Sequence, residues 1–294
     1  MPTLHDPPLI TQRYPGEFFI GFSRDALGLL TQAAQTHGDA CCFKVGPYRA
    51  YLFNHPDLVQ EFFNQHQNFV KEPALLITKT ILGEGLLVSE GEYHKRQRQL
   101  IQPAFHRQRI AGYASIMVEK ALALSSGWSA GQTLDMNVAM MHMALAIVGK
   151  SLFGVSLEEE AVEIDEALGT AMSIFKDWMY RPFPTFWPKF PFPKTLRVRR
   201  ARRTLDKKVF KMIGEHRAAG KDNGDLLSMM LFGEDPANPG SPMTDQQVRD
   251  EAMTLLLAGH ETVGNALTYT WYLLAQNPEA EAIWKVLEEM SGKQ

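Results

Sequence analysis

Four consecutive residues near the end of the chain interrupt an otherwise apolar stretch, and three of them have types suited to proton chemistry. In LLLAGHETVGNAL, residues 255–267, Gly259, His260, Glu261 and Thr262 follow a run of leucines. A glutamate can carry protons, and a threonine hydroxyl in a helix can bond to the carbonyl four residues earlier, which loosens the helix locally. Gly259 removes side-chain bulk. The group therefore predicts either a notch that admits a flat ligand or a close crossing of two helices.

Metal-binding residue types form no recognised pattern in the chain. His260 and Glu261 begin the zinc-protease pattern HExxH, but Gly264 stands at the second histidine position, so that pattern fails. Cys41 and Cys42 are adjacent, which is too close for an ordinary disulfide and unlike the spacing of a zinc site. We therefore predict that protein side chains hold no metal ion. We also predict that both cysteines are free thiols, as in a reducing compartment.

The element that positions the polar group is predicted to be a long central helix. Thr244 and Gln247 form a capping-box pattern at its start, and Pro278 is the next breaker. The helix then has roughly 33 residues and a length of about 50 Å. We expect it to be a central pillar of the fold that buries Leu255–Leu257 on one side and Leu267, Tyr269 and Trp271 on the other.

Most of the remaining sequence has helical spacing. From about residue 90 to 290 the pattern is helical, interrupted by irregular segments at 178–194 and 233–242. The N-terminal part differs, because it predicts a proline-rich extended arm over residues 1–20, a helix over 24–37, a hairpin formed by CCFKVG and RAYLFN, and a short helix that starts near Pro56. The sequence therefore predicts a mainly α fold with a small β region.

Two motifs, in order, resemble those of the cytochrome P450 family. AGHET, residues 258–262, resembles the family's oxygen-activating motif, and ALTYTWYLLAQNPE after it is similar as well. In GEYHKRQRQLIQPAFHRQRI, residues 91–110, His94 and Arg98 precede Pro103-Ala104-Phe105 and resemble the pair that binds a haem propionate. One helical turn separates them, so they share a face. Taken alone, HKRQR would indicate only a solvated basic face.

Of two further stretches, one fits this resemblance and the other is explained without a function. LDMNVAMMHMALAIVGKSLFGV, residues 134–155, resembles the family's next core helix, and its methionines and His142 are expected to pack. RVRRARR, residues 197–203, has no interleaved aromatic residues, so we predict a solvated helix face and not a nucleic-acid site. The net charge of −3 and the pI of about 6.3 also give no reason to expect nucleic acid.

The resemblance implies a cytochrome P450 fold that is truncated after the long central helix. The family's cysteine motif, Phe-x-x-Gly-x-x-x-Cys-x-Gly, and its Glu-x-x-Arg motif do not occur in the sequence. We therefore expect residues 1–294 to be a single incomplete domain without the cysteine that ligates the iron. Its arm and small β part cover about residues 1–70, and its helical part covers about 71–294.

The resemblance also implies a function. It predicts a haem-dependent monooxygenase that hydroxylates an apolar substrate, such as a fatty acid or a terpenoid, with O₂ and two electrons. Thr262 and Glu261 would be catalytic, and the haem-binding residues would be His94, Arg98, Ala258 and Gly259. Substrate contacts are expected from residues 72–88, from residues 178–193 and around Leu255, which are all apolar. Electrons would come from a ferredoxin- or flavodoxin-type donor, because the chain has no flavin or iron–sulfur motif.

Two alternatives remain open at this point. Instead of that monooxygenase portion, the chain is either a non-catalytic remnant or an unrelated all-α binding or scaffold protein that uses AGHET only for close packing. The N-terminus has neither a basic patch followed by an apolar run nor an apolar stretch of about 18 residues. We therefore expect a cytoplasmic protein without a membrane span.

Overall fold

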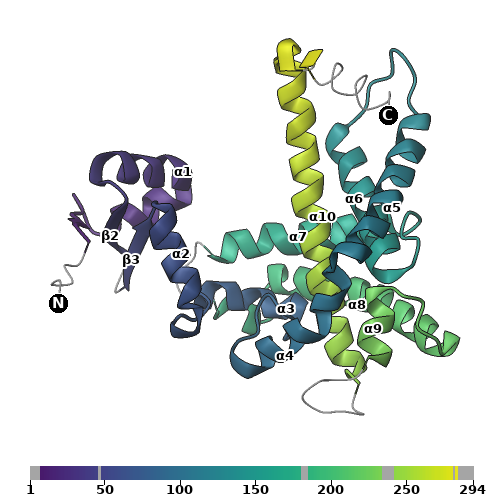
Figure 1. Ribbon diagram of the computed structural model, residues 1–294. Coiled ribbons are helices and arrows are strands. Elements are labelled where there is room, and N and C mark those ends of the chain that lie inside the picture. The colour runs from purple at the N-terminus through teal and green to yellow at the C-terminus, as the bar shows by residue number, and fades with distance from the viewer. Residues whose placement is uncertain (1–6, 46–47, 180–184, 234–241, 281, 284–294) are drawn as a thin grey trace. The chain divides into compact units, whose positions relative to one another are not determined.

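The computed structural model describes residues 7–45, 48–179, 185–233, 242–280 and 282–283. Within these residues the chain is mostly helical and forms one three-stranded sheet (Figure 1). The chain divides into two compact units, which we describe separately: Met1–Glu72 with Asp177–Pro184, and Pro73–Lys176 with Thr185–Gln294. The predicted mainly α fold with a small β region is confirmed.

The first unit holds the sheet. Strand β1 (Leu9–Ile10) pairs in parallel with β2 (Ala40–Val45), which pairs antiparallel with β3 (Tyr48–Phe53). The β2–β3 pairing confirms the predicted hairpin, although its turn at Gly46 and Pro47 lies outside the described residues. Phe43 of β2 is buried, and the rings of Phe18 and Phe22 pack against it with centroids 5.0 and 5.5 Å away.

The first helix of this unit starts earlier than the sequence predicted. Helix α1 (Glu17–His37) has a break at Asp25, whose carboxylate accepts the Gly28 N–H at 2.8 Å. The predicted helix 24–37 is therefore the second half of α1. The extended arm was wrong for residues 17–20, because Gly16 turns the chain with a positive φ of 86° and Glu17 caps the Arg13 N–H. Helix α2 (Pro56–Asn64) starts at the predicted proline and is followed by η1 (His66–Asn68).

The second unit contains the other helices. They are η2 (Pro73–Thr78), α3 (Lys79–Leu82), α4 (Gly91–Ile101), η3 (Gln102–Phe105), α5 (Arg107–Ser126), α6 (Met136–Phe153), α7 (Ala161–Met179), η4 (Trp187–Lys189), α8 (Pro193–Ala219), α9 (Leu226–Phe232) and α10 (Asp245–Gln276). Because α7 continues through Met179, the irregular segment starts later than predicted. The basic residues 197–203 lie on α8, and most face solvent as expected.

Helix α10 is the longest helix of the described chain, and it has the predicted start. The Thr244 hydroxyl accepts the Gln247 N–H, and the Gln247 side chain accepts the Thr244 N–H in return. Figure 1 shows α6 running beside α10, and α8, α9 and α3 also contact it. The first half of α10 is buried, but Tyr269 and Trp271 are 66% and 45% exposed. The expectation that both are buried was wrong. The ion pairs of α10 with α8 and its hydrogen bonds to the α3–α4 loop all lie between Asp245 and Glu251, so these elements cover the start of α10 and not its second half.

Helix α6 is the main neighbour of α10. It is also the one helix in the described ranges that is long and apolar enough to cross a membrane, by length and composition only. Half of that window is buried inside the fold, and Met140 and Leu145 are almost inaccessible. Such burial is what the core helix of a folded domain requires.

A buried ionic cluster joins α10 to α8. The Arg249 side chain has no exposed surface, and its Nε lies 2.7 Å from Asp206 Oδ1 on α8. Its Nη1 lies 2.9 Å from Asp250 Oδ1, which also accepts the Gln246 side-chain amide at 2.8 Å. A buried guanidinium is tolerated only when its donors are satisfied by charged partners. The cluster therefore fixes which face of α10 meets α8.

The same region of α10 holds the loop that leads into α4. Asp250 accepts the Glu84 N–H and Glu251 accepts the Leu86 N–H, both at 2.9 Å. A Cβ on Gly83 would collide with the Asp250 carboxylate, and one on Gly85 would collide with Thr254. Gly83 also has a φ of 62°, which favours glycine. The GEG sequence thus lets the loop lie directly on α10, and α4 begins soon afterwards.

Arg249→Met should destabilise the chain by about 3–5 kcal/mol, because it leaves the buried Asp250 without its cationic partner and leaves Asp206 with Arg202 alone. Urea unfolding followed by circular dichroism measures this loss. Arg200→Met, an exposed position on α8, is the matched control and should change the free energy of unfolding by less than about 0.5 kcal/mol. Equal effects of the two substitutions would contradict the assigned role of the cluster.

Candidate functional site

The centre of α10 has the predicted local bond. The Thr262 hydroxyl donates to the carbonyl of Ala258, one turn earlier. Thr268 and Thr270 make the same kind of bond to Gly264 and Ala266, both at 2.8 Å, so this bond alone does not mark a site. Ala258 and Thr262, both small, are exposed on one face of the helix, but so are Ala266 and Thr270 two turns later, so small exposed residues alone do not mark the turn either. That face can admit a flat ligand.

The opposite side of the same turn is a close helix crossing. A Cβ on Gly259 would lie 2.7 Å from Val148 Cγ2 of α6, which is closer than atoms can approach, and one on Gly264 would collide with Met141. The missing side chain of Gly259 is therefore explained by contact with α6. The notch and the crossing, which the sequence left as alternatives, lie on two different faces of one helix.

His260 belongs to an acid–base group that the sequence analysis missed. The residue is 3% exposed, and its Nε2 lies 2.8 Å from Asp165 Oδ1 of α7, although the two atoms are not aligned for a hydrogen bond. The other Asp165 oxygen lies 3.0 Å from Nε2 of His142 on α6. One carboxylate thus stands between two imidazoles from different helices, and it offsets part of the cost of burying His260. No local pattern could have indicated this group, because each member lies on a separate helix.

This acid–base group does not form a metal site. Among the residues that the structure describes, no group of three or more His, Cys, Asp or Glu side chains is arranged to hold an ion. Glu261 follows His260 directly and is half-buried. A half-buried carboxyl group on α10 therefore lies between the buried histidine and the exposed Thr262.

His94 and Arg98 lie one turn apart on α4. His94 is half-buried and Arg98 is exposed, while Gln97 between them is buried and donates to the Tyr93 hydroxyl at 2.7 Å. In the described part of the chain no carboxylate pairs with Arg98. A guanidinium without an internal partner, beside a histidine on the same face, is suited to bind an external carboxylate. The hydrogen bonds of Glu84 and Leu86 to α10 tie this helix to the AGHET helix.

The two cysteines belong to the other compact unit, in strand β2. Both are free, as predicted, and 0% and 1% exposed. Burial, and then the neighbouring Cys42, raise the pKa of the Cys41 thiol, while Cys42 donates to the Pro7 carbonyl at 3.4 Å. A thiol that is buried and held protonated is a poor source of the thiolate that a metal ligand requires.

Two of the three predicted substrate segments line a common pocket. Its volume is about 420 Å³ and it is open to solvent; its walls are formed by Leu76, Ile77, Thr80, Thr185, Pro188 and Lys189. This size falls in the range of small-molecule sites. Residues 180–184 of the second segment lie outside the described residues, and Leu255, the third predicted contact, is half-buried on α10.

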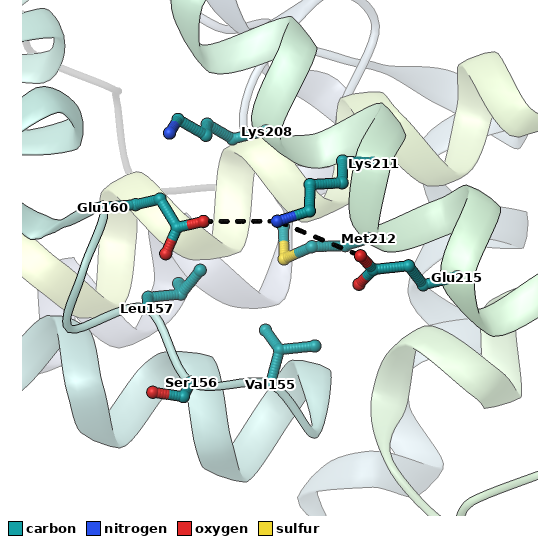
Figure 2. A pocket seen from close by; sticks show the side chains of 8 residues that line it. All are labelled: Val155, Ser156, Leu157, Glu160, Lys208, Lys211, Met212 and Glu215. Carbon is teal, nitrogen blue, oxygen red and sulfur yellow. Dashed lines mark ion pairs between the residues drawn. The ribbon is translucent and has the colours of Figure 1, made fainter.

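A second hollow, between the α6–α7 connection and α8, has no such capacity. Figure 2 shows Lys211 between Glu160 and Glu215, at 3.5 and 4.0 Å. The hollow has a volume of about 30 Å³, which is room for little more than one water. Its exposed ion pairs are typical of a surface that joins two helices, so we assign no site to it.

The AGHET turn lies on α10, and His94 and Arg98 lie on α4. The sequence matches the cytochrome P450 family over residues 18–292, and the chain belongs to that family. It is 38% identical to cyclooctatin synthase and 36% identical to cyclooctat-9-en-7-ol 5-monooxygenase, both of Streptomyces melanosporofaciens, over 84% and 83% of this chain. Pentalenene oxygenase of Streptomyces avermitilis is 31% identical over 84% of the chain. The alignments cover 54%, 53% and 54% of these relatives, so the chain spans about half of their length.

Gly259→Ala should cost about 1–3 kcal/mol of stability, because the added methyl overlaps Val148 on α6. Val148→Ala should recover most of this loss when the two substitutions are combined, as a double-mutant cycle of unfolding free energies will show. Gly169→Ala is the control, since a Cβ there meets nothing, and it should be neutral or stabilising by up to about 1 kcal/mol. Additive effects of Gly259→Ala and Val148→Ala would refute the close crossing.

Proposed function

We propose that the chain forms the part of a haem-dependent monooxygenase on which O₂ and the substrate bind, and that the complete enzyme hydroxylates a C–H bond of an apolar molecule. The observation that carries this proposal is the exposed face of small residues, Ala258 and Thr262, on a helix tied to the α4 helix that bears His94 and Arg98. Membership of the cytochrome P450 family supports it.

The residues present fit one face of a haem. Ala258 offers a flat approach, and Gly259 lets α10 settle against α6, which keeps this face in place. His94 and Arg98 would bind a propionate, since Arg98 has no carboxylate partner in the described part of the chain. When its iron carries a thiolate ligand, haem supplies the activation of O₂. Cys41 and Cys42 are unsuited to that role, so we place the iron ligand outside these 294 residues.

Thr262 and Glu261 have separate roles in this proposal. The Thr262 hydroxyl, which donates to the Ala258 carbonyl, can rotate and donate a proton toward the ligand face instead. Glu261, half-buried on the next position of the helix, would return protons from solvent to Thr262. Because both side chains lie on one loosened turn, a proton reaches the ligand face without opening the whole site to water.

The relatives favour one of the two substrate classes. Their names refer to cyclooctatin, cyclooctat-9-en-7-ol and pentalenene, which favours a terpenoid over a fatty acid. We propose a ferredoxin- or flavodoxin-type protein as electron donor and a cytoplasmic location. We also propose that the two compact units belong to one domain.

A second candidate is that this chain by itself is non-catalytic. Helix α5 has no buried residue, and large apolar side chains are exposed on it and on the second half of α10, among them Met117, Leu122, Tyr269 and Tyr272. Such surfaces promote association of chains. The two candidates differ in whether the isolated chain takes up haem.

Arg98→Leu should weaken haem binding about tenfold or more, because a charge-assisted bond to a propionate is lost. Titration of the chain with haemin, followed at the Soret band, measures the affinity. Arg107→Leu, at the exposed start of α5, is the matched control and should leave it unchanged. Equal haem affinity of the Arg98→Leu chain and its parent would remove the propionate assignment, and a parent that takes up no haem would favour the non-catalytic candidate.

Thr262→Ala in the complete enzyme should allow electron consumption to continue while product formation falls by about tenfold or more and peroxide is released. The ratio of product formed to electrons consumed is the readout. Thr270→Ala removes the same kind of bond two turns later and should leave the ratio unchanged. If both variants keep the parent ratio, Thr262 has no part in proton delivery.

A further inference from the structure

Helix α8 carries a cationic surface that the proposed function does not use. Residues 185–207, which end within this helix, contain eight lysines and arginines and one acidic residue, whereas the whole chain has a net charge of −3. Four exposed cations, Arg199, Arg200, Arg203 and Lys207, lie on the side of the helix that faces solvent. Positions 200, 203 and 207 have the three- and four-residue spacing of a single helix face. We call these four residues the basic face.

The fold keeps the basic face directed outward. On the opposite side of α8, Val198, Leu205 and Val209 have no exposed surface. Asp206 of the same helix pairs with the buried Arg249 of α10. These contacts set the rotation of α8 about its axis, so the basic face remains in solvent.

The basic face differs from the flanks of α8 in having no acidic partners. On the flanks, Arg202 pairs with Asp206 at 3.3 Å and Lys208 pairs with Glu163 at 2.9 Å. In the described part of the chain, no carboxylate lies within ion-pair distance of the four residues of the basic face. Like charges three or four residues apart repel one another along a helix. An external anion would remove this repulsion, whereas nothing within the described chain does so.

Apolar side chains are exposed at both ends of the basic face. Leu196 comes before it and Phe210 after it, and these side chains are 52% and 41% exposed. Just before the helix, the rings of Phe190 and Phe192 lie 6.0 Å apart and are also exposed. Cations beside exposed leucine and phenylalanine are typical of surfaces that bind an anionic membrane. A nucleic acid would bind the cations but has no apolar layer to receive these side chains.

We propose that the basic face binds the headgroups of anionic phospholipids, so that the folded chain attaches reversibly to a membrane surface. The arginines suit this role because a guanidinium group binds a phosphate through two parallel hydrogen bonds. Leu196 and Phe210 reach the boundary between the headgroups and the acyl chains. Each cation near such a surface strengthens binding about fivefold. The inference depends on α8 alone and not on haem binding.

Co-sedimentation of the 294-residue chain with phospholipid vesicles tests this inference. We expect vesicles made of equal parts of phosphatidylglycerol and phosphatidylcholine to bind the chain at least about tenfold more tightly than vesicles of phosphatidylcholine alone. This binding should weaken as salt is added, because salt screens the attraction between exposed charges. Equal binding to both kinds of vesicle, or no binding to either, would overturn the inference.

The triple variant Arg199→Gln, Arg200→Gln and Arg203→Gln should bind the anionic vesicles about a hundredfold more weakly, because three cations are lost. The corresponding triple substitution by lysine keeps the charges and should retain most of the affinity. All three side chains are exposed, so both variants should keep the circular dichroism spectrum of the parent chain.

A second triple variant, Arg107→Gln, Lys150→Gln and Lys221→Gln, is the matched control. It removes the same charge from exposed positions outside the basic face and should keep most of the parent affinity. Equal losses in the two glutamine variants would mean that only net charge matters, which contradicts a defined binding face. Binding of a single-stranded oligonucleotide as tight as that of the anionic vesicles would replace the membrane with nucleic acid as the partner.

Discussion

The placement of the second unit's helices depends on one buried ionic cluster at the start of α10. Arg249 is inaccessible to solvent and requires both Asp206 of α8 and Asp250 of its own helix. Asp250 and its neighbour Glu251 then accept backbone N–H groups of the loop before α4. Charges buried in this way admit few alternative arrangements, since a shifted helix would leave one of them unpaired. The orientation of α4 relative to α10 is therefore set by electrostatics as well as by apolar packing.

The buried ionic contacts and the exposed AGHET turn lie on different parts of α10. The first half, up to Leu256, is buried and carries the charged contacts, whereas the AGHET turn exposes Ala258 and Thr262. A helix that is held firmly at one end can bear a loosened, accessible turn further on at little cost. Gly259 adds a second constraint, because its contact with Val148 fixes the rotation of that turn about the helix axis.

Local patterns predicted much of this structure, and the reasons for the failures are physical. The capping box at Thr244, the paired strands around residues 40–53 and the back-bond of Thr262 depend on residues close in sequence, and all three are confirmed. The burial of Tyr269 and Trp271 was wrong, because an apolar side chain is buried only where another element covers it. The helical residues 17–20 were missed because their start depends on the backbone angle of Gly16.

The part of the site that sequence could not provide is the part made by contacts between distant segments. Asp165 stands between His142 and His260, and Lys189 lines a pocket together with Thr80. In neither group does the sequence spacing indicate contact. A family motif names the residues of one helix, but the carboxylate that faces His260 comes from α7. Residues that distinguish this chain within its family therefore have to be sought on these packed segments, since specificity depends on what faces the shared motif and not on the motif itself.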